Sequence, residues 1–288
     1  MTDETIDREN RIATASASGS LKIQAVAAFA SSIALLTAGL FVVANYFGWV
    51  APLAAIAEGS TLLMLIYSGA LLLIILGVAL RGLHWHPHSR YGAANFITTA
   101  RASGTALVAA IIPIAAPLNV QLSAGALDTQ ILFAEHALWL ITVFIVVLLV
   151  LDGLDGYLAR RSALLSQFGA RFDMEVDALL ILVISVLIWQ SGEVGIWIVS
   201  LGLMRYFFVA ASLVYQPLAA ELYPSLRRKT VCVIQLVVLC AIVSPVIHAP
   251  LSGVLGVIGL ICLIASFARD IRWLCQQASP QSPGNGTE

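Results

Sequence analysis

Long apolar runs alternate with short polar connections along most of the chain. No Asp, Glu, Lys or Arg interrupts residues 23–57 or residues 59–80. A charge at the centre of a bilayer costs at least about 2.5 kcal/mol, so uncharged runs of this length are typical of membrane-spanning helices. We interpret eight segments as spans: residues 25–48, 60–81, 97–117, 136–158, 173–190, 195–215, 230–247 and 251–268. The pattern predicts an all-α fold, a polytopic membrane helix bundle of about eight transmembrane helices.

The composition agrees with a membrane protein and excludes several other classes. Of the 288 residues, 60% are hydrophobic and 11% are charged, whereas soluble domains carry about 25% charged residues. The formal net charge of -1 excludes a basic surface for nucleic acid. The four cysteines form no Cys-x-x-Cys pair, so we expect neither a disulfide framework nor a zinc site.

Lysine and arginine residues predict which ends of the spans face the cytoplasm, because membrane insertion leaves them on that side. With the N-terminus inside and eight spans, every Lys and Arg except Arg205 falls on the cytoplasmic side. We expect an integral protein of a bacterial inner membrane whose N-terminus is cytoplasmic. The polar head, residues 1–22, and the polar tail, residues 276–288, are expected to be disordered.

An acidic cluster stands at the cytoplasmic ends of the fourth and fifth expected spans. Asp152 and Asp155 are three residues apart and Asp173 and Asp177 are four apart, so each pair shares one helix face. The short connection between the spans makes them antiparallel neighbours, which brings both pairs to one cleft. Four carboxylates this close repel one another unless a cation compensates them, and oxygen ligands favour Mg2+ or Mn2+. The cluster therefore favours a divalent-metal site over a solvated acidic helix face.

The residues in and around this cluster follow the pattern D-x-x-D-G-x-x-A-R, eight residues, G-x-x-x-D-x-x-x-D. The matching residues are Asp152, Asp155, Gly156, Ala159, Arg160, Gly169, Asp173 and Asp177. This pattern resembles that of the CDP-alcohol phosphatidyltransferases, integral membrane enzymes that make phospholipids by displacing CMP from a CDP-linked donor. Upstream, Asn95, Thr98 and Arg101 are similar to the family's N-x-x-T-x-x-R, with Ala94 where members usually have proline.

The resemblance implies a six-helix catalytic core at residues 83–275, preceded by two additional spans at residues 23–82. It implies that Asp152, Asp155, Asp173 and Asp177 bind Mg2+ or Mn2+, and that Asp177 is the general base for the acceptor hydroxyl. The residues implied to bind the CDP part of the donor are Asp152, Gly156, Ala159, Arg160, Asn95, Thr98, Arg101 and Gly169. The implied partners are a CDP-linked lipid such as CDP-diacylglycerol in the bilayer, an acceptor alcohol or lipid, and a second copy of the chain in a homodimer.

Basic residues in the second half of the chain are candidates for an acceptor phosphate. Arg205 lies within an expected span, where an arginine is costly, and either binds an acceptor or pairs structurally. Arg227, Arg228 and Lys229 form a basic run that positive-inside anchoring also explains. Glycerol 3-phosphate is therefore the favoured acceptor, while inositol phosphate, serine, choline and a second lipid stay open.

Other features of the chain allow weaker or competing interpretations. The histidines at positions 84, 86 and 88 are interpreted as part of an interfacial loop and not as a metal site. Glu175 is interpreted as an exposed acid outside the cluster. A membrane prenyltransferase also binds Mg2+-diphosphate with aspartates on neighbouring helices, but it does not require the G-x-x-A-R between the pairs. A transporter with intramembrane acids usually has internal repeats, and none is visible in this sequence.

Overall fold

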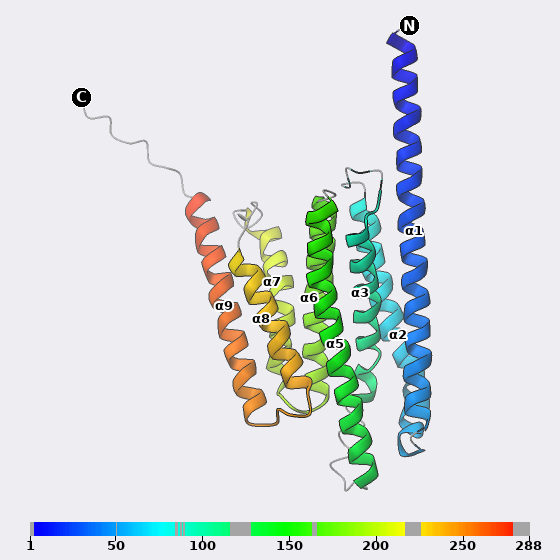
Figure 1. Ribbon diagram of the computed structural model, residues 1–288. Coiled ribbons are helices and arrows are strands. Elements are labelled where there is room, and N and C mark those ends of the chain that lie inside the picture. The colour runs from blue at the N-terminus through cyan, green and yellow to red at the C-terminus, as the bar shows by residue number, and fades with distance from the viewer. Residues whose placement is uncertain are drawn as a thin grey trace, which may run out of the picture.

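The computed structural model describes residues 3–49, 51–83, 86, 88, 90–115, 128–162, 166–216 and 226–278, and this part of the chain is all-α. Eight α-helices and one short 3-10 turn make up the described fold: α1 (Asp3–Trp49), α2 (Ala51–Gly82), α3 (Ala93–Ala109), α5 (Asp128–Ser162), α6 (Gln167–Gln190), η2 (Ile196–Val199), α7 (Ser200–Val214), α8 (Leu226–Val243) and α9 (Leu251–Ala278). The α-helices lie side by side and run up and down in a bundle (Figure 1). The prediction of an all-α helix bundle is confirmed.

Within the described residues, six helical segments are long and apolar enough to cross a membrane. They are Gly19–Asn45, Thr61–Gly82, Ala93–Ala115, Ala134–Leu158, Ile196–Val214 and Leu251–Gln277. The expected count of eight spans was wrong. The two segments that do not qualify, residues 173–190 and 230–247, belong to α6 and α8.

Charged residues near one end explain why α6 and α8 contain no apolar segment long enough to count as a membrane span. Two of the site acids, Asp173 and Asp177, lie with Glu175 in the first half of α6. Three basic residues at positions 227–229 lie in the first turn of the 18-residue helix α8. Their uncharged stretches are correspondingly short. Both helices nevertheless pack inside the bundle, where α6 contacts α3 and α7, and α8 contacts α5 and α9.

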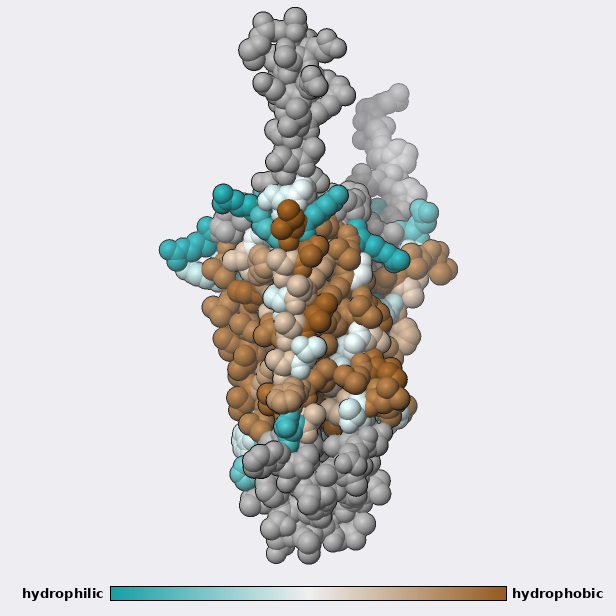
Figure 2. Space-filling view, turned by 90° about the vertical axis from the view of Figure 1, so that its right-hand side faces the viewer, coloured by the Kyte–Doolittle hydropathy of each residue, from teal (hydrophilic) through white to brown (hydrophobic). Residues whose placement is uncertain are grey.

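The outer face of α1 and α2 is hydrophobic over most of its height (Figure 2). Large apolar side chains there point outward, among them Ile23, Phe41, Leu62 and Leu73, each at least 68% exposed. Hydrophilic residues gather at one end of this face (Figure 2). Such exposure is stable only in contact with lipid, so the surface supports the assignment of the chain to a membrane.

Helix α3 occupies the middle of the bundle, packed by α1, α2, α5 and α6. Small residues permit this close approach: Gly104 leaves no room for a Cβ, which would lie 2.4 Å from Leu148 Cδ2. In the apolar segment that includes α3, 72% of the residues are buried. In the apolar segments of α5, α7 and α9 this share is at most 28%. Helix α3, which carries Asn95, Thr98 and Arg101, is therefore surrounded by other helices of the protein.

The described residues at the two ends of the chain are helical, while disorder of the head and tail stays a prediction. Helix α1 begins at Asp3, so residues 3–22 are helical. This head contains no proline and only Gly19 as a glycine, so nothing in it breaks the helix that leads into the first span. At the other end α9 continues to Ala278, and the remainder of the predicted tail lies outside the described residues.

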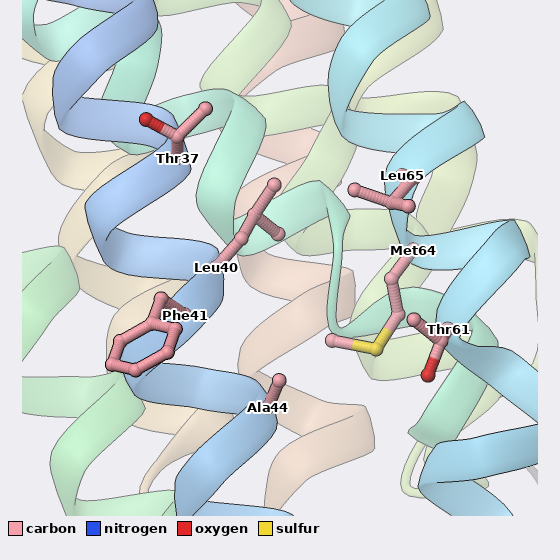
Figure 3. A pocket seen from close by; sticks show the side chains of 7 residues that line it. All are labelled: Thr37, Leu40, Phe41, Ala44, Thr61, Met64 and Leu65. Atoms are coloured by element: carbon pink, nitrogen blue, oxygen red, sulfur yellow. The ribbon is translucent and has the colours of Figure 1, made fainter.

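A groove of about 290 Å³ separates α1 from α2 (Figure 3). Its lining is mostly apolar and comprises Thr37, Leu40, Phe41, Ala44, Thr61, Met64 and Leu65. These residues lie toward the C-terminal end of α1 and the N-terminal half of α2, which is the end of the bundle away from the acidic cluster (Figure 1).

Candidate active site

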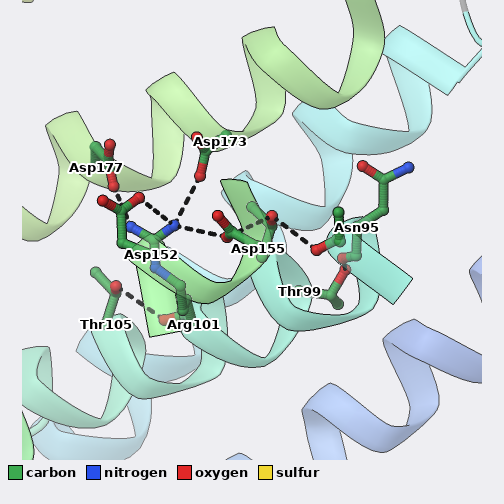
Figure 4. Close-up of polar contacts among 10 residues, drawn as sticks. Asn95, Thr99, Arg101, Thr105, Asp152, Asp155, Asp173 and Asp177 are labelled. Atoms are coloured by element: carbon green, nitrogen blue, oxygen red, sulfur yellow. Dashed lines mark hydrogen bonds and ion pairs between the residues drawn. The ribbon is translucent and has the colours of Figure 1, made fainter. Parts of the chain in front are cut away.

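Two helices bring the predicted acidic residues together, and a third, α3, adds a basic residue between them (Figure 4). Asp152 and Asp155 lie in the last turns of α5, and Asp173 and Asp177 lie in the first half of the antiparallel α6. Helix α6 begins at Gln167 because Ser166 is its N-cap: the Ser166 hydroxyl accepts a hydrogen bond from the Gly169 N–H at 3.0 Å. The two acidic pairs therefore lie close to each other, with the guanidinium of Arg101 between them.

Arg101 of α3 occupies the centre of this cluster. One guanidinium nitrogen, Nη1, lies 2.9 Å from Asp152, 3.0 Å from Asp155 and 2.7 Å from Asp173. The other, Nη2, is ion-paired with Asp177. The Arg101 side chain is 1% exposed, and within the described residues its Nε has no hydrogen-bond partner. One positive charge meets four carboxylates, so the cluster keeps an excess of negative charge.

The cluster fits a divalent metal ion. Carboxylate oxygens of Asp152, Asp155 and Asp173 all lie within 4.8 Å of one another, a set of hard oxygen ligands of the kind that Mg2+ and Mn2+ prefer. The side chains of Asp152 and Asp173 are partly exposed, so a ligand can reach the cluster at these two carboxylates.

Two further residues of the N-x-x-T-x-x-R segment have separate positions in the site. The Thr98 hydroxyl donates to Asp155 Oδ2 at 3.1 Å and so orients that carboxylate. Asn95 donates to the Tyr91 carbonyl instead, and its Oδ1 would lie 2.8 Å from a Cβ at Gly169. Only glycine at position 169 allows the N-terminal ends of α3 and α6 to come this close.

A family model supplies the identity that this geometry supports. The model of the CDP-alcohol phosphatidyltransferases matches residues 91–265, which is more than half of the chain. The chain belongs to the CDP-alcohol phosphatidyltransferase family. Comparisons with curated proteins and with solved structures gave no match.

Membership in this family identifies the chain as a membrane-bound phosphotransferase of phospholipid synthesis. It moves a phosphoalcohol from a CDP-alcohol donor to an acceptor alcohol and releases CMP. The matched region begins at Tyr91 and ends at Ala265, close to the core expected from sequence at residues 83–275. Helix α1 and helix α2 precede the matched region.

His86 has a structural role at the edge of this phosphatidyltransferase site. Its Nε2 lies 2.8 Å from the Arg90 carbonyl and therefore carries the proton, so Nδ1 accepts from the Ser166 hydroxyl at 3.0 Å. Burial, the largest effect, lowers the pKa of His86 and so favours the neutral ring that this arrangement needs. The imidazole thus ties the segment before α3 to the N-cap of α6. Residues 84 and 85 lie outside the described residues.

The predicted acceptor-binding arginines have partners of their own. Arg205 is ion-paired with Glu175, the acid expected to be simply exposed. Arg227 donates to the Ser266 carbonyl at 2.9 Å and to Asp270 Oδ1 at 2.5 Å, which ties α8 to α9. Arg205 is therefore paired with an acid of the fold, as one of the two interpretations of this residue expected. The side chains of Ala159 and Arg160, expected to bind the donor, lie outside the described residues.

Sequence reasoning missed the residues that support the site from outside the motif. Ser166 directly precedes α6, and a serine before an apolar run is a common N-cap signal that could have identified it. Gln24 and Ser32 of α1 contact the motif-bearing segment, but nothing in the local sequence distinguishes them from other polar residues of a membrane helix.

Proposed function

We propose that this protein transfers a phosphatidyl group from CDP-diacylglycerol to an acceptor alcohol, with its active site at the cytoplasmic face of the membrane. One observation carries the proposal: four carboxylates converge on a single buried arginine at the end of a lipid-exposed helix bundle. A diacylglycerol donor suits this placement, because its acyl chains can remain in the bilayer while its diphosphate reaches the cluster.

Asp152, Asp155 and Asp173 are the residues that would hold Mg2+ or Mn2+. When bound there, the ion supplies Lewis-acid stabilisation of the negative charge on the donor diphosphate. Arg101 contributes a fixed positive charge beside the same oxygens. Thr98 keeps Asp155 oriented through its hydrogen bond.

Asp177 is suited to act as the general base. It contacts Nη2 of Arg101, whereas the three carboxylates that gather within 4.8 Å contact Nη1. An alcohol attacks poorly unless a positioned base takes its proton. The acceptor oxygen forms a bond to the β-phosphorus of the donor as the bond from that phosphorus to the bridging oxygen breaks. The hydroxyl proton passes to Asp177, and CMP leaves with the bridging oxygen.

We assign the CDP part of the donor to residues of the two motif segments. They are Gly156, Ala159, Arg160, Gly169, Asn95, Thr98 and Arg101, together with Asp152. The partial exposure of the Asp152 side chain supports an approach of the donor to this end of α5.

The positions of basic residues support a cytoplasmic active site. Helices α2 and α9 end, and α8 begins, at the same end of the bundle as the acidic cluster (Figure 1). These helix ends carry Arg81, Arg269, Arg272 and the run at 227–229. Insertion leaves such residues on the cytoplasmic side.

A phosphorylated acceptor such as glycerol 3-phosphate is the acceptor we propose to test first. Arg228 and Lys229 lie at the start of α8, at the same end of the bundle as the cluster. Arg205 adds a second polar position, because its Nε and the neighbouring Tyr206 hydroxyl are buried without a partner in the described part of the chain. Arg227 is less suited, since its guanidinium is already committed to α9.

The test is CMP release from CDP-diacylglycerol by the purified protein. The assay contains Mg2+ or Mn2+ and one acceptor from a panel of glycerol 3-phosphate, inositol phosphate, serine, choline and a lipid alcohol. We expect CMP formation with one acceptor and its loss on addition of EDTA. CMP formation that is insensitive to EDTA would contradict the metal assignment, and no CMP with any acceptor would contradict the donor assignment.

A further inference from the structure

Helix α1 lies outside the region that the family model matches, yet it contacts the motif-bearing helix directly. Its buried face includes Ala25, Ala28, Phe29, Ser32 and Leu36, spaced as one stripe of a helix. Three of these residues are small and at most 1% exposed, so the α1 backbone can approach α3 closely. A Cβ at Gly39, further along the same helix, would lie 2.6 Å from Leu107 Cδ2 of α3.

Ser32 makes a polar contact in the middle of this apolar stripe. Its hydroxyl donates to the Thr99 carbonyl at 3.2 Å and meets the Ser103 hydroxyl. The Ser103 hydroxyl in turn donates to the Ser32 carbonyl at 2.9 Å. Apolar packing alone permits one helix to slide or rotate on another, whereas a reciprocal pair of hydrogen bonds in a low-dielectric interface fixes one register.

This contact brackets Arg101 from the opposite side of α3. Thr99 is two residues before Arg101 and Ser103 two residues after it, so both lie about 200° around the helix from the arginine. In Figure 4, Arg101 points toward the aspartates, while the blue ribbon of α1 lies beyond the other side of α3. The register of α3 on α1 therefore sets where the guanidinium stands among the carboxylates.

A second contact fixes the start of α3. The Tyr91 N–H donates to Gln24 Oε1 of α1 at 2.9 Å. The Tyr91 hydroxyl is 2.9 Å from Thr99 Oγ1, which donates to the Asn95 carbonyl at 2.7 Å. Tyr91 is fully buried, so its backbone N–H has no access to water if Gln24 is removed. Gln24 and Ser32 thus hold the motif segment at two heights along α1.

We propose that α1 is a positioning element of the active site, and that Ser32 and Gln24 are positioning residues which set the register of α3 and hence the location of Arg101 and Thr98. Neither residue touches the acidic cluster. Each acts through α3, whose opposite face carries the groups that contact Asp155, Asp173 and Asp177. The helix that precedes the matched core is thereby part of the catalytic framework.

The experiment compares two adjacent serines in the full-length protein. Ser32→Val replaces the buried hydroxyl by a branched apolar group, and Ser31→Val makes the same change at an exposed residue whose hydroxyl bonds only within α1. Steady-state CMP release gives kcat and the KM for the donor, and thermal unfolding of the same samples reports the folded fraction. We expect kcat to fall about tenfold in Ser32→Val, since misplacing a reacting group by about 1 Å costs up to about 100-fold. The KM for the donor and the rates of Ser31→Val should stay within about twofold of the parent.

Gln24 provides an independent arm that does not alter the helix interface. Gln24→Leu removes the oxygen that accepts from the Tyr91 N–H, and Gln24→Glu keeps an accepting oxygen at the same distance along the side chain. We expect a lower kcat in Gln24→Leu and a kcat near that of the parent in Gln24→Glu. Three outcomes would overturn the proposal: equal kcat in Ser32→Val and Ser31→Val, a loss of activity that the unfolded fraction fully explains, or equal kcat in the two Gln24 variants.

Discussion

Three arginines in the described part of the chain, Arg101, Arg205 and Arg227, pair with different numbers of carboxylates. Arg101, in the acidic centre, faces four carboxylates and is 1% exposed. Arg205 and Arg227, in the α7 to α9 half of the bundle, face one each, and both are 25% exposed. The peripheral pairs each match one positive charge with one negative charge, and they hold α6 to α7 and α8 to α9. The centre has four carboxyl groups for one guanidinium and so has capacity for a further cation.

The difference distinguishes ion pairs that stabilise the fold from a cluster that is suited to chemistry. A buried pair whose charges match recovers its desolvation cost from the partner and from added hydrogen bonds, as Arg227 does with Ser266 and Asp270. Unmatched carboxylates in a low-dielectric site are costly unless a metal ion or a substrate compensates them. Protein stability alone gives no reason to gather four of them, and metal and diphosphate binding do.

Substitution of matched aspartates tests this distinction most strongly. Asp177→Asn removes the proposed general base, and we expect the rate of CMP release to fall about 10²- to 10⁴-fold while the protein remains folded. Asp270→Asn makes the same change at a buried carboxylate of a peripheral pair. We expect it to lower the free energy of unfolding by about 1–3 kcal/mol and to leave the rate per folded molecule nearly unchanged. Near-normal turnover in purified Asp177→Asn would exclude that residue as the base.

Replacement of the arginines themselves separates the two regions by their response to metal. Arg101→Gln removes the cation from among four carboxylates, and we expect the free energy of unfolding in EDTA to fall by about 3–5 kcal/mol. Saturating Mg2+ should restore more stability in this variant than in the parent, because binding to the folded state alone stabilises it.

Arg227→Gln is the matched control for this experiment. We expect a loss of about 1–3 kcal/mol in this variant, with no added response to Mg2+. Thermal unfolding in detergent, with EDTA or with Mg2+, measures all of these changes. An equal response of both variants to Mg2+ would show that the acidic centre has no special affinity for the ion.

The smallest expected effect concerns pH and the contact between His86 and the N-cap of α6. Burial lowers the pKa of His86 below its ordinary value in the folded protein, so the unfolded chain binds this proton more readily. The contribution to stability is therefore complete above about pH 6.5 and is lost as the pH falls further. Protonated His86 cannot accept from Ser166, and we expect a loss of about 1 kcal/mol.

Urea or thermal unfolding at about pH 7.5 and pH 5.5 measures this loss. The decrease should be smaller in His86→Gln than in the parent. His248→Gln, at an exposed histidine whose Nδ1 lies 3.2 Å from Glu193 Oε1, makes the same substitution away from this contact and serves as the control. Identical pH responses in all three proteins would show that His86 does not titrate in this way.

Local pattern sufficed to predict much of this protein. The apolar runs predicted an all-α membrane bundle, and the spacing of four aspartates predicted two acidic pairs that face each other. The same spacing indicated a resemblance to the CDP-alcohol phosphatidyltransferases, and the family model that matches residues 91–265 confirmed it. The predicted number of spans was wrong because α6 and α8 were counted as spans. Each of these helices has charged residues near one end, which leave too short an apolar segment.

The sequence by itself determined those features that depend on short spacings: helical periodicity, shared helix faces and a motif of fixed gaps. Only the tertiary structure decided which cation stands among the aspartates, that Glu175 and Asp270 neutralise the peripheral arginines, and that α1 holds α3 through Gln24 and Ser32. These contacts join residues 30 to 76 positions apart, from Glu175 with Arg205 to Arg101 with Asp177. A local pattern cannot predict them, because the partner of a charge or a hydroxyl is chosen by the packing of whole helices.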